Sequence, residues 1–212
     1  MRAAQAVAQA SSIYLDMGLA VVLPRQQPPF GHDESVLIDP SGHILLIYQK
    51  AHPVPGEEDL RLVAGKGQIP VVATPYGRLA TVVCYDRDFL DIINRVGQAH
   101  ADILLVPTGD WRDIDPYHTQ VTTFAAIETG SSQVSQADEG RSVAVDYEGN
   151  VLASTDFFTT DPQVMVAYIP MQGVHTMYAT IGDLFAWLSL VGSVALIGVA
   201  LARRRKATIG TP

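Results

Sequence analysis

The sequence predicts an α/β layered domain followed by a membrane-spanning helix. Short apolar runs rich in β-branched residues alternate with segments of helical spacing, which favours interleaved strands and helices packed in layers. A charge-free apolar run near the C-terminus then ends this pattern. We therefore divide the chain into a domain, a connector, a membrane helix and a basic tail, which cover residues 1–175, 176–183, 184–202 and 203–212.

The first part of the chain predicts a helix, a short strand and a β-hairpin. Its N-terminal segment is Ala-rich with helical spacing, and Gly18 suits the C-cap of that helix. Pro40, Ser41 and Gly42 supply turn residues between two apolar runs, as in a hairpin. The predicted elements are a helix over residues 1–17 and strands over 19–23, 35–39 and 43–48.

The rest of the domain predicts more strands than helices. A second strand pair surrounds the turn at Pro75–Gly77, and residues 102–107 form a continuous apolar run of the kind that is buried on both faces. Two segments with helical spacing separate these strands from the later ones. The predicted strands cover residues 68–74, 79–84, 102–107, 133–137, 142–146, 151–154 and 163–169, and the predicted helices cover 89–96 and 120–130.

The C-terminal apolar run is long enough to cross a bilayer. As a helix, Leu184–Ala202 would rise about 28 Å, close to the ~30 Å of a hydrocarbon core. Arg203–Lys206 follows it at once, so the positive-inside rule predicts a cytoplasmic C-terminus and a domain outside the plasma membrane. The alternative, a buried core helix, rarely lacks a polar face. The net charge of −8 argues against a nucleic-acid partner.

Cys84, the single cysteine of the sequence, follows an apolar strand-like run and precedes a helical segment. A free cysteine is most often a buried filler. A strand-to-helix turn, however, holds a side chain at the rim of a sheet and directs backbone N–H groups and a helix N-terminus toward it, which favours a thiolate. Both interpretations of Cys84 follow from this local pattern.

Further polar side chains gather after the predicted strand that ends at Lys50, where Lys50, His52, Glu57 and Glu58 lie within nine residues. With residues 83–86, this segment resembles the carbon–nitrogen hydrolase (nitrilase) superfamily, and in particular the apolipoprotein N-acyltransferases. The resemblance runs in collinear order from about residue 30 to 206. Its further segments are residues 106–118, 124–130, 139–142, 146–149 and 176–183, followed by the apolar helix and the basic tail.

The resemblance implies a nitrilase-type αββα sandwich, incomplete at its N-terminus, and a site that needs no cofactor or metal. It implies that Cys84 is the nucleophile, that Lys50 holds the oxyanion, and that Glu57 or Glu58 is a loop glutamate that positions the lysine. The spacing from Lys50 favours Glu58, whereas the local Gly-Glu order favours Glu57. It further implies substrate contacts by Tyr85, Asp86 and Trp111, although a packing role for Trp111 is equally compatible with the sequence.

The implied reaction moves an acyl group from a membrane phospholipid, through a cysteine thioester, to the N-terminal amine of a diacylglyceryl lipoprotein. The general-base glutamate of the superfamily, which precedes the segment matching residues 1–17, has no counterpart here. We therefore expect a C-terminal portion that is inactive or nearly so alone, with the missing N-terminal half as a possible partner. The rival hypotheses are a hydrolase of a small amide or nitrile and an inactive truncated domain.

Overall fold

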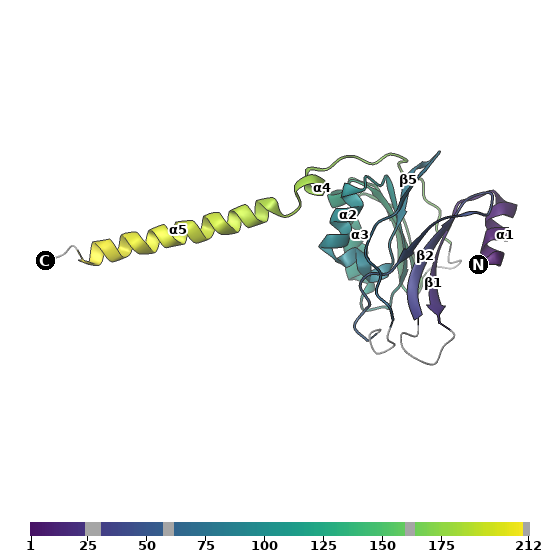
Figure 1. Ribbon diagram of the computed structural model, residues 1–212, viewed down its shortest axis with the longest axis horizontal. Helices are drawn as coiled ribbons and strands as arrows, with labels where there is room; N and C mark the ends of the chain where they lie inside the picture. Colours follow the sequence, from purple (N-terminus) through teal and green to yellow (C-terminus); the bar gives the residue numbers. More distant parts are fainter. Residues whose placement is uncertain (24–30, 57–61, 160–163, 210–212) are drawn as a thin grey trace.

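Four layers build the domain in this computed structural model, which describes residues 1–23, 31–56, 62–159 and 164–209. A helix, a three-stranded sheet, a six-stranded sheet and a pair of helices follow one another across it (Figure 1). The elements, in order, are α1 (Arg2–Ser11), β1 (Leu15–Val22), β2 (Gly31–Ile38), β3 (Ile44–Gln49), β4 (Val71–Thr74), β5 (Gly77–Thr81), the 3₁₀ helix η1 (Cys84–Asp88), α2 (Leu90–Gln98), β6 (Ile103–Gly109), α3 (Asp115–Thr129), β7 (Ser132–Asp138), β8 (Arg141–Val145), β9 (Val151–Asp156), α4 (Met177–Ile181) and α5 (Leu184–Ile209).

The two sheets differ in strand direction. The smaller sheet, β1-β2-β3, is antiparallel throughout. The larger sheet has the order β4-β5-β6-β7-β8-β9, and its central pairs β5–β6 and β6–β7 are parallel. Parallel neighbours need crossover connections, which here contain α2 and α3. The chain therefore enters the helical layer from the carboxyl ends of β5 and β6, which are followed by η1 and α2 and by α3.

Alternation along β2 joins three of the layers. Val36 and Ile38 are buried against α1, where they pack with Ala8. Leu37, on the opposite face of the same strand, packs with Leu79 of the larger sheet. Because successive side chains of a strand point to opposite faces, one strand contributes to both cores. The nitrilase-type αββα fold expected from the resemblance is confirmed.

The first helix is shorter than predicted. It ends at Ser11, and Ser12 adopts the left-handed conformation with φ 53° that closes it. Gly18 lies inside β1 rather than at a helix C-cap, so the predicted role of Gly18 is wrong. A Cβ at residue 18 would stand 2.9 Å from the Cβ of Pro107 in β6, so glycine allows the two sheets to approach closely there.

The predicted last strand is also wrong over its described part. Residue 163 lies outside the described residues, and residues 164–169 form no strand ladder. Val164, Val166 and Tyr168 expose 68, 75 and 93% of their surface, so the apolar side chains that predicted a strand here are not buried. Ile169, at the end of this segment, is partly buried and packs against the core between the two sheets.

The predicted hairpins, the helix after Cys84 and the parallel strand over residues 102–107 are confirmed with shifted ends. The helix α3 was predicted from residue 120 but starts at Asp115, with Pro116 in its first turn. Proline suits the first turn of a helix because it lacks only an N–H that would have no partner there. The additional turn brings His118 to the same end of the domain as Cys84.

The C-terminal part leaves the domain through two helices. In α4, Ala179 is buried and packs close to Gly97 of α2. From there α5 projects away from the layers (Figure 1). Its segment Leu184–Leu201 has a mean hydropathy of 2.3, and none of it is buried against the described part of the chain. By length and composition, this helix can cross a membrane.

Candidate active site

Cys84 occupies a strained position at the start of η1. β5 ends at Thr81, Val83 is still extended, and Cys84 then adopts a φ of 48°. A left-handed backbone at a residue other than glycine costs on the order of 1–3 kcal/mol and is concentrated at functional sites. The thiol is 7% exposed and donates to the carbonyl oxygen of Gly109, at the end of β6, across 3.7 Å. This geometry keeps the sulfur at the rim of the sheet.

A cavity of about 390 Å³ with two charged side chains in its wall adjoins Cys84. Its wall includes Lys50, which directly follows β3, and Asp33 of β2. The Lys50 ammonium is 3.5 Å from Asp33 Oδ2, and the Lys50 side chain is only 5% exposed. The Lys50 N–H also donates to the Asp33 carbonyl at 2.9 Å, so the strand register fixes both residues. A buried cation therefore stands beside the thiol, in the same cavity.

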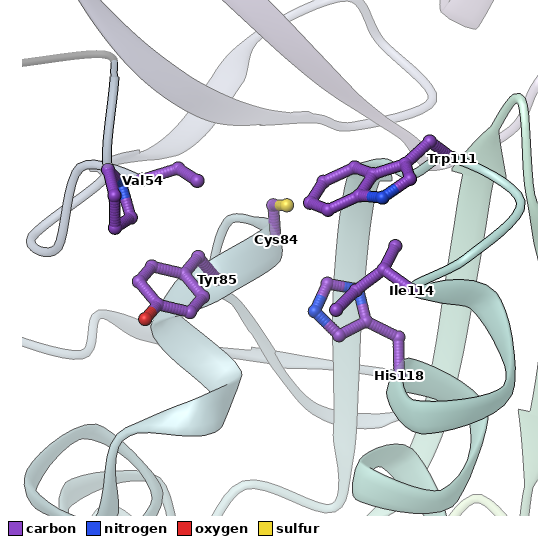
Figure 2. Close-up of a pocket in the computed structure, with 7 residues that line it drawn as sticks. Val54, Cys84, Tyr85, Trp111, Ile114 and His118 are labelled. Atoms are coloured by element: carbon purple, nitrogen blue, oxygen red, sulfur yellow. The ribbon is translucent and has the colours of Figure 1, made fainter.

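An apolar pocket of about 340 Å³ also adjoins Cys84 and shares Val54, Pro55 and Trp111 with the first cavity. Figure 2 shows the sulfur within a ring of side chains from three parts of the chain. Trp111 is half exposed and lines both cavities. The pocket is lined by Val54, Pro55, Cys84, Tyr85, Trp111, Ile114 and His118. This arrangement places an apolar binding volume and a cation around one thiol.

Asp86 is fully buried and holds the loop that follows Lys50. Its carboxylate accepts hydrogen bonds from the Tyr48 hydroxyl at 2.7 Å, from the Ala51 N–H at 2.9 Å and from the His52 N–H at 2.7 Å. Burial, followed by the charge of Asp86, raises the pKa of Tyr48 far above its usual value. Asp86 lines neither cavity, so its placement favours an anchoring role over the expected substrate contact.

His118, which lines the apolar pocket, belongs to a buried histidine–carboxylate cluster. His118 Nδ1 lies 2.6 Å from Asp110 Oδ1, and its Nε2 lies 3.5 Å from Asp88 Oδ2. Burial alone would lower the pKa of His118, but the hydrogen bonds to Asp110 and Asp88 outweigh it and raise the pKa to about 9. His118 is therefore an imidazolium at neutral pH and has no free nitrogen lone pair with which to accept a proton.

Arg87 adds a second buried cation behind the thiol. Its Nη1 donates to Ser135 Oγ at 2.7 Å. Burial lowers the pKa of Arg87, and the charges of Asp110 and Asp88, together with Cys84, oppose that change. With two cations facing two carboxylates, the Arg87–His118 cluster is close to charge balance, which is how charges are usually accommodated in an interior.

The structure brings most of the predicted site residues together and adds others. Cys84, Lys50, Tyr85 and Trp111 surround the two cavities, whereas Glu57 and Glu58 lie outside the described residues. Sequence reasoning missed Asp33 and gave His118 no functional role. Asp33 lies on a strand whose alternation points residues 33, 35 and 37 toward the other sheet, and this pattern was the available signal.

The chain is similar in sequence to a known protein family and to several known proteins. The family model described as carbon-nitrogen hydrolase matches residues 1–178. The chain is 29% identical over 194 residues to an apolipoprotein N-acyltransferase of Geobacter metallireducens, which covers 82% of this chain and 36% of that protein. It is also 29% identical over 138 residues to a deaminated glutathione amidase of Rattus norvegicus, which covers 56% of this chain and 42% of that protein.

Among solved structures, a mutant amidase from Nesterenkonia sp. AN1 is similar in fold and carries the acetamide moiety of fluoroacetamide on its active-site cysteine. It is 25% identical, with a TM-score of 0.66, and the alignment covers 73% of this chain and 61% of that one. The chain thus spans about two fifths of the length of the curated relatives it matches.

Proposed function

Because the chain belongs to the carbon-nitrogen hydrolase family, we propose that it is an acyltransferase domain that uses Cys84 as its nucleophile. The thiolate of Cys84 attacks the ester carbonyl of a phospholipid, the lysophospholipid leaves, and the acyl group remains as a thioester. The N-terminal amine of a diacylglyceryl lipoprotein then attacks the thioester. Lys50, assisted by the N–H of Tyr85, holds the oxyanion in both steps.

The observation that carries this proposal is that Cys84 lines both a cavity that contains a buried cation and an apolar pocket. A preorganised cation beside the thiol stabilises an oxyanion, and Lys50 supplies one. A fatty acyl chain needs an apolar volume that adjoins the thiol, and Val54, Tyr85 and Ile114 help to form it. A small amide would use the first feature and leave the second empty.

Two further observations support lipid substrates. The similarity to the Geobacter acyltransferase covers more of this chain than the similarity to the rat amidase, although the identities are equal. The helix α5 is exposed, apolar and long enough to span a bilayer, which would hold the domain beside its lipids. We place the domain outside the bacterial plasma membrane and the C-terminal end of α5 in the cytoplasm, because basic residues follow the apolar segment.

Proteolysis of intact spheroplasts tests this topology. Trypsin added outside should digest the domain and leave the C-terminal end of α5 protected until the membrane is permeabilised. Protection of the domain with cleavage of the C-terminal end would contradict the proposed orientation, and release of the whole chain by carbonate washing would contradict the membrane span.

The acyl acceptor separates the proposed function from the amidase alternative, which the rat relative favours. The full chain is incubated in phosphatidylethanolamine vesicles that carry a labelled acyl chain, together with a synthetic diacylglyceryl-cysteinyl peptide. We expect label on the peptide amine, no transfer to a matched peptide whose amine is acetylated, and no transfer by Cys84→Ala. Hydrolysis of deaminated glutathione without acyl transfer to the peptide would favour the amidase and contradict the proposal.

A further inference from the structure

The chain just before α4 is hydrogen-bonded to the end of the domain that lies opposite Cys84. We call residues 170–176 the junction segment. The Gly173 N–H donates to Asp102 Oδ1 at 2.8 Å, directly before β6 begins. The Val174 N–H donates to the Gly130 carbonyl at 2.8 Å, where α3 ends. The junction segment is therefore held across the amino ends of β6 and β7.

Two exposed histidines meet beside this segment. His100 lies between α2 and β6, and His175 lies in the junction segment, 75 residues further along the chain. Their Nε2 atoms are 3.1 Å apart and their ring centroids are 3.8 Å apart. His100 adopts a left-handed backbone with φ 55°, which glycine or asparagine adopts more readily. Two imidazoles from distant parts of the chain thus converge on one point that solvent can reach.

The separation of the two Nε2 atoms matches that of two ligands on one metal ion. Zinc–imidazole bonds of about 2.0–2.1 Å that diverge by about 90–110° hold their nitrogen atoms about 2.9–3.4 Å apart. The observed 3.1 Å lies within this range. A straight N–H···N hydrogen bond would hold the ring centroids farther apart, because each Nε2 lies at the edge of its ring. Small rotations of the two exposed side chains would direct both lone pairs at one ion.

The ligand type indicates which ions the pair would bind. Imidazole nitrogen suits zinc, copper and nickel, whereas magnesium and calcium prefer oxygen ligands. Within the part of the chain that the structure describes, no group of three or more His, Cys, Asp or Glu side chains could hold a metal ion. The two histidines would therefore supply two ligands, and water would complete the coordination. Such a site suits reversible binding rather than a permanently held structural ion.

We propose that His100 and His175 together bind one late transition-metal dication, of which Zn²⁺ is the probe used below, and that the ion holds the junction segment against the domain. Both ligands are in place only when the junction segment is docked, so the ion makes its release rarer by mass action. The helices α4 and α5 follow directly. The ion would thus stiffen the link between the domain and the apolar helix. This inference is independent of acyl transfer at Cys84.

Calorimetric titration and amide hydrogen exchange test the site together. The full chain, without a histidine tag, is treated with EDTA, dialysed in detergent micelles and alkylated with iodoacetamide, so that the thiol of Cys84 does not bind the ion. We expect one Zn²⁺ per chain and no binding of Mg²⁺. At free Zn²⁺ about tenfold above Kd, exchange of the Gly173 and Val174 amides should slow about tenfold, because only the docked segment binds the ion.

Three variants and one double variant separate a chelate from scattered surface histidines. His100→Asn, which tolerates the left-handed backbone, and His175→Gln should each weaken Zn²⁺ binding at least about tenfold. The double variant should bind no more weakly than either single variant, because a chelate is lost with its first ligand. The matched control is His43→Gln, since His43 is exposed and has a carboxylate oxygen of Asp39 at 3.7 Å. That variant should bind Zn²⁺ like the wild type.

Several results would overturn the inference. The first is a Zn²⁺ affinity that is the same in the wild type, His100→Asn and His175→Gln. The second is a loss in His43→Gln equal to that in the paired histidines. The third is Zn²⁺ binding that leaves exchange at Gly173 and Val174 unchanged. A hydrogen bond between the rings without an ion predicts faster exchange in both single variants and no effect of Zn²⁺ on the wild type, which would also overturn it.

Discussion

Replacement of Asp16 by asparagine should stabilise the protein at neutral pH and not at acidic pH. Asp16 of β1 lies between the sheets, where Ser35 Oγ donates to its Oδ1 at 2.8 Å and Thr81 Oγ1 is 3.4 Å from its Oδ2. Burial raises the pKa of Asp16 from 3.8 to about 6, against the two hydrogen bonds, which lower it. The ionised carboxylate is thus less stable in the folded state than in the unfolded state.

The size and sign of the effect follow from proton linkage. Because the pKa of Asp16 is raised on folding, its favourable contribution is complete below about pH 4 and is lost as the pH rises through about 6. A shift from 3.8 to about 6 corresponds to at most about 3 kcal/mol at ~1.4 kcal/mol per unit. Asp16 keeps part of its surface exposed, so solvent screening reduces the expected gain to about 1–2 kcal/mol.

Urea unfolding in detergent, followed by near-ultraviolet circular dichroism from pH 4 to 8, measures this effect. The free energy of unfolding of Asp16→Asn minus that of the wild type should rise across this range and level off above pH 7. The matched control Asp113→Asn, at an exposed position, should show no such rise. A difference that does not vary with pH, or a variant less stable than the wild type at pH 7.5, would refute the reasoning.

Two further predictions concern packing around the site. Asp86→Asn removes an acceptor oxygen from a buried group that binds Tyr48, Ala51 and His52, so the free energy of unfolding in urea should fall by about 1–3 kcal/mol. Acylation by an activated ester should also slow, because the loop after Lys50 loses its anchor; unchanged values for both would contradict that role. Gly97→Ala would place a Cβ 2.7 Å from the Cβ of Ala179, so it should displace α4 and increase amide hydrogen exchange in that helix. The control Gly109→Ala, whose added Cβ has nothing within 4 Å, should leave exchange in α4 unchanged. Equal exchange in the two variants would contradict this packing of α4.

Local sequence signals located most of the domain's elements. Proline and glycine at the hairpins, and the continuous apolar run over residues 102–107, depend on neighbours in the chain and are therefore readable from it. The start of β1 was not readable in this way, because the helical pattern continues past Ser12, whose left-handed backbone ends α1. The alternation of Val164, Val166 and Tyr168 likewise predicted a strand, but these residues are exposed and form no ladder.

The site was predictable only in part, for a related reason. Cys84 and Lys50 each stand at the end of a strand-like run, and the family resemblance paired them. The contact between Asp33 and Lys50, and that between His118 and Asp110, depend on strand register and on an early start of α3. Register joins residues that are far apart in the chain, so no local pattern indicates which carboxylate will pair with Lys50.

The mass of the full chain after exposure to acyl-labelled phospholipid vesicles tests the central claim most directly. The proposed mechanism predicts one acyl group per chain on Cys84, the single cysteine, in a hydroxylamine-sensitive bond that disappears when the lipopeptide amine is added. The adduct should be absent from Cys84→Ala. An acyl group attached elsewhere, or an adduct that persists in Cys84→Ala, would contradict the claim that this thiol carries the acyl group.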